Sequence, residues 1–215
     1  NNLVLNKGGA STLSVGGATT TINVANYTQT LGNFSAPATF TASGNVLLSA
    51  GNLTAGASTN AAGDWTNNGG TFTPGGGTVT FNGGGARSIN GTAATQTFNN
   101  LVINKPGGSV TVGGSTTTLN VANLTETAGD FNAPATLTAS GGITLYGGTY
   151  TAGTNTNIAG NFTKNGATFV AGAGTVTMNG AGAQTIGGST STSFQNLTTS
   201  NTTTTSIVMS ATAST

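Results

Sequence analysis

The sequence predicts an all-β fold, a parallel β-solenoid that runs as one continuous domain over residues 1–215. Three observations lead to this expectation: a long internal repeat, a shorter period of 19 residues inside it, and a composition that disfavours helix. A solenoid coil cannot bury its inward side chains alone, so the sequence of a solenoid repeats at the length of its coil.

The long repeat covers nearly the whole chain. The stretch "NNLVLNK" at 1–7 returns as "NNLVINK" at 99–105, and a third copy opens with "QNLTTSN" at 195–201. The longer stretch "ANYTQTLGNFSAPATFTASG" at 25–44 returns as "ANLTETAGDFNAPATLTASG" at 122–141. The chain therefore divides into unit 1 (1–98), unit 2 (99–194) and a partial third unit (195–215), which we treat as parts of one solenoid.

Large apolar residues recur every 19 positions inside each unit. In a solenoid, each such series becomes a column of inward side chains, because equivalent positions of successive coils lie above one another. We expect four core columns: Tyr27, Val46 and Trp65; Phe34, Leu53 and Phe72; Leu124, Ile143 and Phe162; Phe131, Tyr150 and Phe169. Coils of 19–20 residues predict about eleven coils, and a rod of roughly 50 Å at about 4.8 Å per coil.

The composition supports short strands and corners rather than helices. The chain has 36 glycines and many threonines, which favour turns and strands respectively. Stretches such as "TVTFNG" and "ATFTASG" alternate apolar residues with threonine or serine, which is the pattern of a strand with one buried face. Only seven residues are charged, and a charge repeated in every coil would lie about 5 Å from its like neighbour and repel it.

The repeat resembles a known family. The stretches "GNLTAGAST" and "GDWTNNGGTFTPGGGTVTFNGGGARSING", with their second copies, are similar to the units of the bacterial "beta strand repeat" surface and secreted proteins. The resemblance covers essentially the whole chain. It implies a right-handed parallel β-solenoid displayed outside the cell, and it implies no catalytic or binding residue here.

The residue types argue against an enzyme or a cofactor site. Cysteine and histidine are absent, and the three carboxylates are too few for the clusters that hydrolases, lyases and metal sites use. The two copies also disagree at charged positions, since Glu126 aligns with Gln29, Asp130 with Asn33 and Lys164 with Asn67. We expect no catalytic, cofactor-binding or metal-binding residue. Glu126 and Asp130 are interpreted as a solvated pair at one corner, with a bound cation as the alternative.

The composition also bears on partners and location. A net charge of +1 provides no electrostatic footprint for nucleic acid, and no apolar run approaches the length of a membrane span. An uncharged surface of threonine, serine and asparagine suits an extracellular or cell-surface location. Eight Asn-x-Ser/Thr sequons leave glycosylation open; they begin at Asn26, Asn33, Asn52, Asn90, Asn123, Asn161, Asn196 and Asn201.

Two functions follow as hypotheses. The first is a non-enzymatic structural role, as the shaft of a surface filament or adhesin. Here the partner is a second copy stacked head to tail, or the flanking repeats of a longer chain, through exposed terminal strands at Leu3, Val4 and Leu5 and at Ile207, Val208 and Met209. The alternative is an ice- or glycan-binding module that uses Thr-x-Thr pairs such as Thr39/Thr41 and Thr136/Thr138 on one face. A regular row of outward threonines would favour this alternative.

Overall fold

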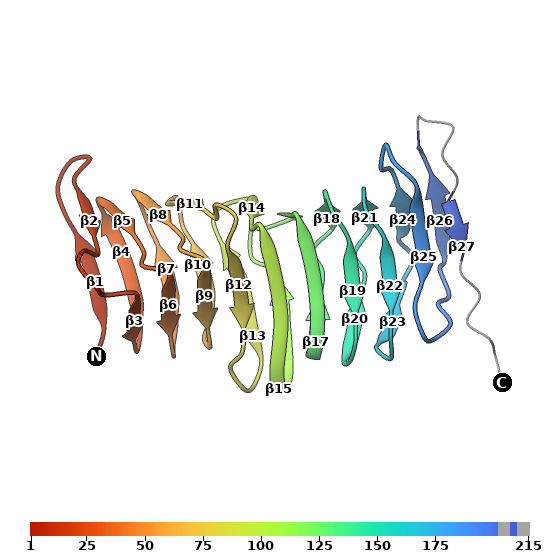
Figure 1. Cartoon of the computed structure of the whole chain (residues 1–215), viewed down its shortest axis with the longest axis horizontal. Coiled ribbons are helices and arrows are strands. Elements are labelled where there is room, and N and C mark those ends of the chain that lie inside the picture. The colour runs from red at the N-terminus through yellow and green to blue at the C-terminus, as the bar shows by residue number, and fades with distance from the viewer. Residues whose placement is uncertain (202–206, 210–215) are drawn as a thin grey trace.

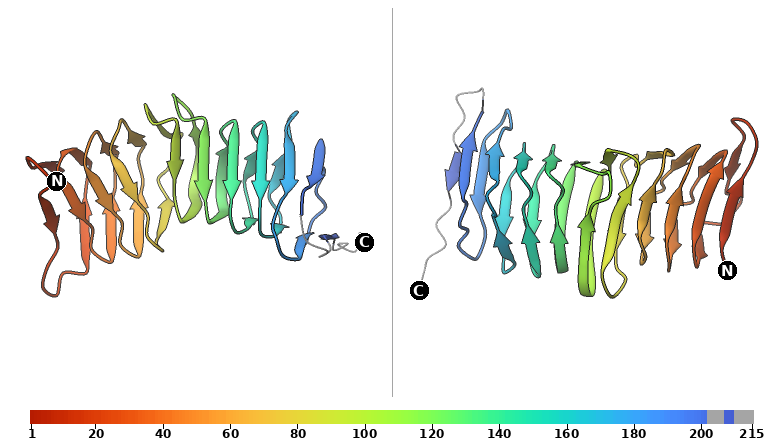
Figure 2. Two further views of the ribbon diagram at one scale, coloured as in Figure 1. Left: turned by 90° about the horizontal axis from the view of Figure 1, so that it is seen from above. Right: turned by 180° about the vertical axis from the view of Figure 1, so that it is seen from behind.

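The computed structural model describes residues 1–201 and 207–209, and throughout this part of the chain the only regular secondary structure is β-strand. Short strands follow one another around a coil, and each strand pairs in parallel with the strands of the neighbouring coils (Figure 1). Views from above and from behind show the same stack of coils along one axis (Figure 2). The chain is therefore a parallel β-solenoid, as the sequence predicts.

Each coil has three faces. The first face carries β1 (Leu3–Asn6), β4 (Tyr27–Leu31), β7 (Val46–Leu48), β10 (Trp65–Asn67), β13 (Arg87–Gly91), β20 (Thr149–Thr151) and β23 (Thr168–Val170). The second face carries β2 (Thr12–Ser14), β5 (Asn33–Ser35), β8 (Asn52–Thr54), β11 (Thr71–Thr73), β14 (Thr95–Thr97), β16 (Thr118–Val121), β18 (Thr136–Ala139), β21 (Asn155–Ile158), β24 (Thr175–Met178) and β26 (Asn196–Thr199).

The third face carries β3 (Thr21–Val24), β6 (Thr39–Ala42), β9 (Ser58–Ala61), β12 (Thr78–Phe81), β19 (Ile143–Leu145), β22 (Phe162–Lys164), β25 (Gln184–Gly187) and β27 (Ile207–Met209). Two longer strands, β15 (Asn100–Val112) and β17 (Asn123–Asn132), run from the third face around a corner onto the first. The third face is therefore the longest unbroken ladder in the described residues, since parallel pairs join all its strands from β3 to β27.

The third-face ladder has about ten rungs, where a rung is the strand that one coil contributes. The solenoid therefore has about ten coils rather than the eleven predicted from the 19-residue period. The difference arises because some coils are longer than 19 residues. Leu3 pairs with Tyr27, 24 positions on, and Trp65 pairs with Ile89, again 24 positions on. The extra residues form loops such as 82–86, which extends from the rod between β12 and β13 in Figure 1. Ten rungs at about 4.8 Å give a rod of roughly 45 Å.

The four predicted core columns are present in the register of the strands. Tyr27 pairs with Val46 and Val46 with Trp65, and Leu53 lies between Phe34 and Phe72 in the same way. Unit 2 repeats both series, through Leu124, Ile143 and Phe162 and through Phe131, Tyr150 and Phe169. All these side chains are buried except Phe72 and Phe169, which are half-buried. Aromatic rings fill the coil between columns, for example Tyr27 and Phe40, with centroids 5.3 Å apart.

Successive units do not place equivalent strands on the same face. Unit 1 begins on the first face with β1, whereas unit 2 begins on the third face, where Asn100–Ile103 of β15 pairs with β12. Fourteen strands, β1 to β14, precede this point, and at three strands per coil they make four and two-thirds coils. The third unit follows the same rule and begins on the second face, where β26 pairs with β24. Each unit is therefore rotated by a third of a turn relative to the unit before it.

Candidate functional site

The corners of the coil are held by asparagine and aspartate side chains. The Oδ1 atom of Asn26 accepts the backbone N–H of Asn45 (2.8 Å), and the Oδ1 atom of Asn45 accepts the N–H of Asp64 (2.9 Å). Asp64 continues the series by accepting the N–H of Ser88 at 2.8 Å. In unit 2, the Oδ1 atom of Asn161 accepts the N–H of Thr185 at 2.8 Å. These bonds connect one coil to the next where the strand ladder is interrupted.

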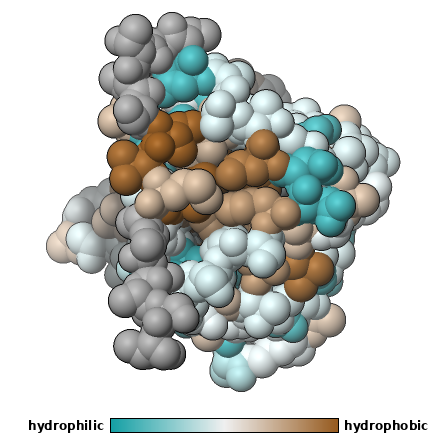
Figure 3. Space-filling model, turned by 90° about the vertical axis from the view of Figure 1, so that its right-hand side faces the viewer, coloured by the Kyte–Doolittle hydropathy of each residue, from teal (hydrophilic) through white to brown (hydrophobic). Residues whose placement is uncertain are grey.

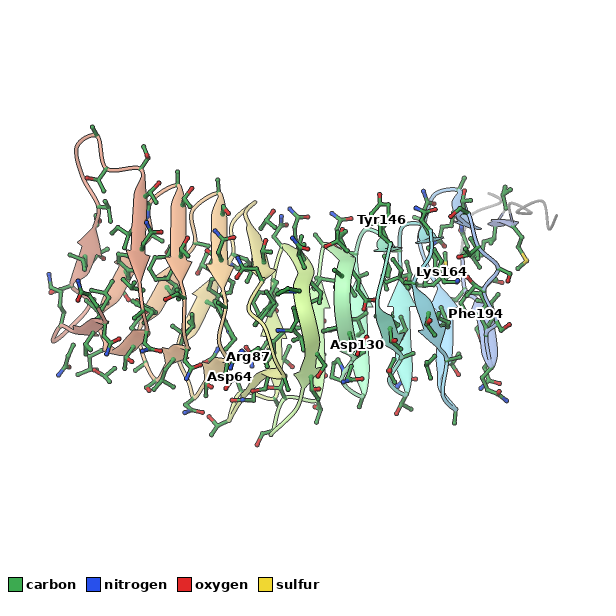
Figure 4. The ribbon with its side chains drawn as sticks, turned by 90° about the horizontal axis from the view of Figure 1, so that it is seen from below. Asp64, Arg87, Asp130, Tyr146, Lys164 and Phe194 are labelled. Atoms are coloured by element: carbon green, nitrogen blue, oxygen red, sulfur yellow. The ribbon has the colours of Figure 1, made fainter. Side chains whose placement is uncertain are left out.

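The corner bonds explain why some charges differ between the two copies. Asp64 and Asn161 are equivalent, and each side chain supplies one acceptor oxygen to the next coil. Asn33 and Asp130 form a second such pair, with Asn52 and Thr149 as the respective donors. Either residue type serves, because the corner requires an acceptor and not a charge. Figure 4 shows Asp64 and Asp130 at separate places along the rod.

The same interactions involve the asparagines of the sequons. A glycan would be attached to the side-chain nitrogen, and in Asn26 this nitrogen donates to the Oδ1 atom of Asn2 (2.9 Å). In Asn123 it donates to the Oδ1 atom of Asn100 (3.0 Å), and in Asn33 to the carbonyl of Ala10 (3.2 Å). A glycan at these positions would replace contacts between coils, which argues against using them as glycosylation sites.

Polar side chains also lie inside the coil. In unit 1, Gln29 is completely buried and hydrogen-bonded at both ends of its amide: its Oε1 atom accepts the hydroxyl of Tyr27 (2.6 Å), and its Nε2 atom donates to the carbonyl of Gly32 (2.7 Å). Gln29 lies in register between Leu5 and Leu48, so the amide is enclosed by apolar rungs. The satisfied amide stabilises this interior position, because burying a polar group without partners is costly.

Unit 2 has a carboxyl group at the same interior position. Glu126 is completely buried between Ile103 and Leu145, and both of its oxygens lack a hydrogen-bond partner. Burial raises the pKa of Glu126 to about 8; the negative charge of Asp130 adds to the rise, and the backbone amide of Phe131 opposes it. The interpretation of Glu126 and Asp130 as a solvated pair is therefore wrong. Asp130 bonds to the next coil at a corner, whereas Glu126 points into the core.

The sequence contains a signal that indicates the burial of Glu126. Glu126 follows the core residue Leu124 by two positions, and strand residues two apart share a face. Buried lysines follow the same rule, since Lys105 comes two positions after the buried Ile103. The ammonium of Lys105 bonds to the carbonyl of Gly83, and that of Lys164 donates to the carbonyl of Ala167 (3.0 Å) and the hydroxyl of Thr190 (2.7 Å).

The second face presents the most uniform outer surface. On each of its ten strands, two side chains point outward, and all twenty are threonine, asparagine or serine. From β14 to β26 one row reads Thr95, Thr118, Thr136, Asn155, Thr175 and Asn196, and the other reads Thr97, Asn120, Thr138, Asn157, Thr177 and Thr198. The rows are divided between β11 and β14, which are not paired; a groove of about 250 Å³ lined by Phe72 and Gln96 lies at this break.

The predicted terminal contact residues lie on the first and last rungs. Leu3 is half-buried, Val4 is exposed and Leu5 is buried in β1, which pairs with β4. At the other end, Ile207 is half-buried, and Val208 and Met209 are exposed in β27. Figure 3 looks onto this end and shows hydrophobic side chains gathered at its centre. The remainder of the partial third unit, 202–206 and 210–215, lies outside the described residues.

The described residues bring together no group of three or more side chains of the types that hold metal ions. A search of the same residues finds no helix suited to crossing a membrane. None of the known family models, curated proteins or solved structures compared with the chain matches it.

Proposed function

We propose that the chain is a non-enzymatic structural element, the shaft of a filament or adhesin displayed outside the cell. The observation that carries this proposal is the third-face ladder, which runs without a break through ten rungs and forms one wall of a continuous apolar core. Corner bonds such as Asn26 to Asn45 add a second connection between coils. A rod held together in this way resists bending, and the few charges on its outer surface make its stability only weakly dependent on salt. The extracellular location rests on the resemblance to surface repeat proteins and on the neutral polar surface.

Lengthening of the rod would occur at its terminal rungs. Leu3 and Met209 are inward positions of β1 and β27, the strands of the terminal rungs, and every strand pair within the described residues is parallel, so a second copy or a flanking repeat can continue the stack. Contact between two different end surfaces is heterologous and does not close, and it therefore produces a thread. The partner is the next copy of the chain or the next repeat of a longer one.

Electron microscopy and sedimentation of the purified chain test this proposal. We expect threads with an axial repeat of roughly 45 Å, from ten rungs at about 4.8 Å each. A variant with Leu3→Lys and Met209→Lys should give short rods, because both side chains are at inward positions of the terminal rungs and the lysines would place charges at the joint. Leu31→Lys is the matched control, since Leu31 is exposed but lies on the side of the rod. Single rods of the unmodified chain at all concentrations would contradict head-to-tail assembly.

The second face supports one further candidate, an ice- or glycan-binding module. Its two rows of threonine, asparagine and serine repeat at the rung spacing, so hydroxyl and amide groups recur along the rod like the groups of a regular lattice. A variant with Thr136→Lys and Thr175→Lys should lose binding to ice or to insoluble polysaccharide. The matched variant with Thr28→Lys and Thr66→Lys, on the first face, should keep it. If the unmodified chain binds neither material, this candidate is wrong.

A further inference from the structure

Glu126 is the one interior carboxyl group in the described residues, and the structural role proposed above does not use it. Its side chain is completely buried, and both oxygens lack hydrogen-bond partners. An ionised carboxylate in this position would lose its hydration, and among the described residues only the backbone amide of Phe131 would offset part of that loss. A neutral carboxyl group is far less costly to bury, so the geometry favours the protonated form.

The charged and titratable groups around Glu126 do not offer it a counter-ion. On its own strand, Asp130 is negatively charged and disfavours a second negative charge. On β20, the buried hydroxyl of Tyr150 lies near Glu126 and the Thr156 hydroxyl, and burial raises its pKa, so it stays neutral and offers no counter-charge. The nearby cations are bound elsewhere: Lys105 on β15 reaches the carbonyl of Gly83, and Lys164 on β22 reaches Ala167 and Thr190.

Unit 1 provides an internal comparison at the equivalent position. Gln29 has the shape of a protonated glutamic acid and is bonded at both ends, to Tyr27 and to the carbonyl of Gly32. A glycine follows in the next coil in both units, Gly51 beside Gln29 and Gly148 beside Glu126, and a Cβ atom on either would approach the side-chain head group closely. The pocket in the coil is therefore built for an uncharged head group, and unit 2 fills it with an acid.

We propose that Glu126 is held as a buried, protonated carboxylic acid and makes the solenoid a pH-sensitive rod that is most stable in acid and loosens as the pH rises. The unfolded chain releases this proton near the ordinary pKa of 4.5, whereas the folded chain keeps it to about pH 8. Between these values the unfolded state binds fewer protons, so the unfolding equilibrium constant increases about tenfold per pH unit. The chain has no histidine and only two other acidic side chains, which leaves few groups to mask the effect.

Denaturant unfolding at pH 5 to 9 tests the proposal with two variants taken from the protein's own repeat. Glu126→Gln reproduces the residue of unit 1 and should abolish the tenfold change per pH unit. Asp130→Asn reproduces Asn33 and keeps the corner acceptor for Thr149. This variant should retain the tenfold change per pH unit, but the change should end at a lower pH, because the negative charge that raises the pKa of Glu126 is gone. Equal slopes in the unmodified chain and in Glu126→Gln would overturn the proposal.

Infrared spectroscopy provides a measurement that does not depend on unfolding. The unmodified chain should show the carbonyl stretch of a protonated carboxyl group at pH 7, and Glu126→Gln should lack it. The band should disappear as the pH rises through about 8. Absence of the band from the folded, unmodified chain at pH 6 would overturn the proposal.

Discussion

Glu126 occupies in unit 2 the interior position that Gln29 occupies in unit 1, yet only Gln29 is hydrogen-bonded. The two residues lie on different faces of the rod, Gln29 in β4 and Glu126 in the third-face part of β17. The repeat thus conserves the environment of a position while rotating it around the axis. This relationship makes one unit the natural control for the other.

The buried tyrosines offer a first matched pair. The hydroxyl of Tyr27 donates to Gln29, whereas the hydroxyl of Tyr150 lies near the hydroxyl of Thr156 without a hydrogen bond of normal geometry. Tyr27→Phe should destabilise the protein by about 1–3 kcal/mol, because it leaves a buried amide oxygen without its donor. Tyr150→Phe should change the free energy of unfolding by less than about 0.5 kcal/mol, or stabilise the protein. Urea unfolding at pH 5 compares the two; an equal loss in both variants would contradict the assignment of the hydrogen bond.

The corner acceptors give a second prediction. Asn161→Asp should leave stability within about 0.5 kcal/mol of the unmodified chain, because Asp64 already performs the same role in unit 1. Asn161→Ala should cost about 1 kcal/mol, since the backbone N–H of Thr185 loses its partner. Thermal unfolding of both variants measures the difference, and a larger loss in the aspartate variant would contradict the account of the corners.

The core column gives a third prediction. Leu53 is completely buried and lies between the rings of Phe34 and Phe72 in adjacent coils. Leu53→Ala should cost about 2–5 kcal/mol, through lost burial and the cavity left behind. Leu31→Ala, at a side chain that is 48% exposed, should cost less than about 1 kcal/mol and serves as the control. Similar losses in the two variants, measured by urea unfolding, would contradict the predicted column.

Close approach of the coils at Gly148 gives a fourth prediction. Gly148 has a φ of +84°, and a Cβ atom there would overlap the carbonyl oxygen of Gly129 in the coil below. Gly148→Ala should destabilise the protein by on the order of 3 kcal/mol, from backbone strain together with the overlap. Gly84→Ala, in the loop between β12 and β13, meets no atom within 4 Å and should change stability by less than about 0.5 kcal/mol. Thermal melting of the two variants checks this, and equal melting temperatures would contradict it.

The sequence predicted the composition of each column but not the number or the arrangement of the coils. Tyr27, Val46 and Trp65 are spaced by 19 residues, and their register follows directly from that spacing. The rotation between units could not be predicted, because all three faces show the same alternation of an apolar residue with threonine or asparagine. The loop at 82–86 lengthens one coil without disturbing this alternation, so the repeat length alone does not reveal which face comes next.

The candidate site was predicted less well than the fold. The interpretation of Glu126 and Asp130 as a solvated pair rests on the rule that isolated acidic side chains are seldom buried. In this protein, Glu126, Lys105 and Lys164 are inside the coil, and the outer surface carries mostly hydroxyl and amide groups. The position of Glu126 in the period-2 pattern after Leu124 indicates burial, but only a three-dimensional arrangement shows that both oxygens lack partners.

Cross-linking between units tests the central claim, that the chain is a solenoid whose second unit is rotated by a third of a turn. The chain contains no cysteine, so pairs can be introduced cleanly. Thr80 of β12 pairs in register with Val102 of β15 on the third face, and the double variant Thr80→Cys, Val102→Cys should react efficiently with a short bifunctional thiol reagent. Ser88→Cys, Val102→Cys places its thiols on different faces and should not react. Efficient cross-linking of the second pair without the first would contradict the account.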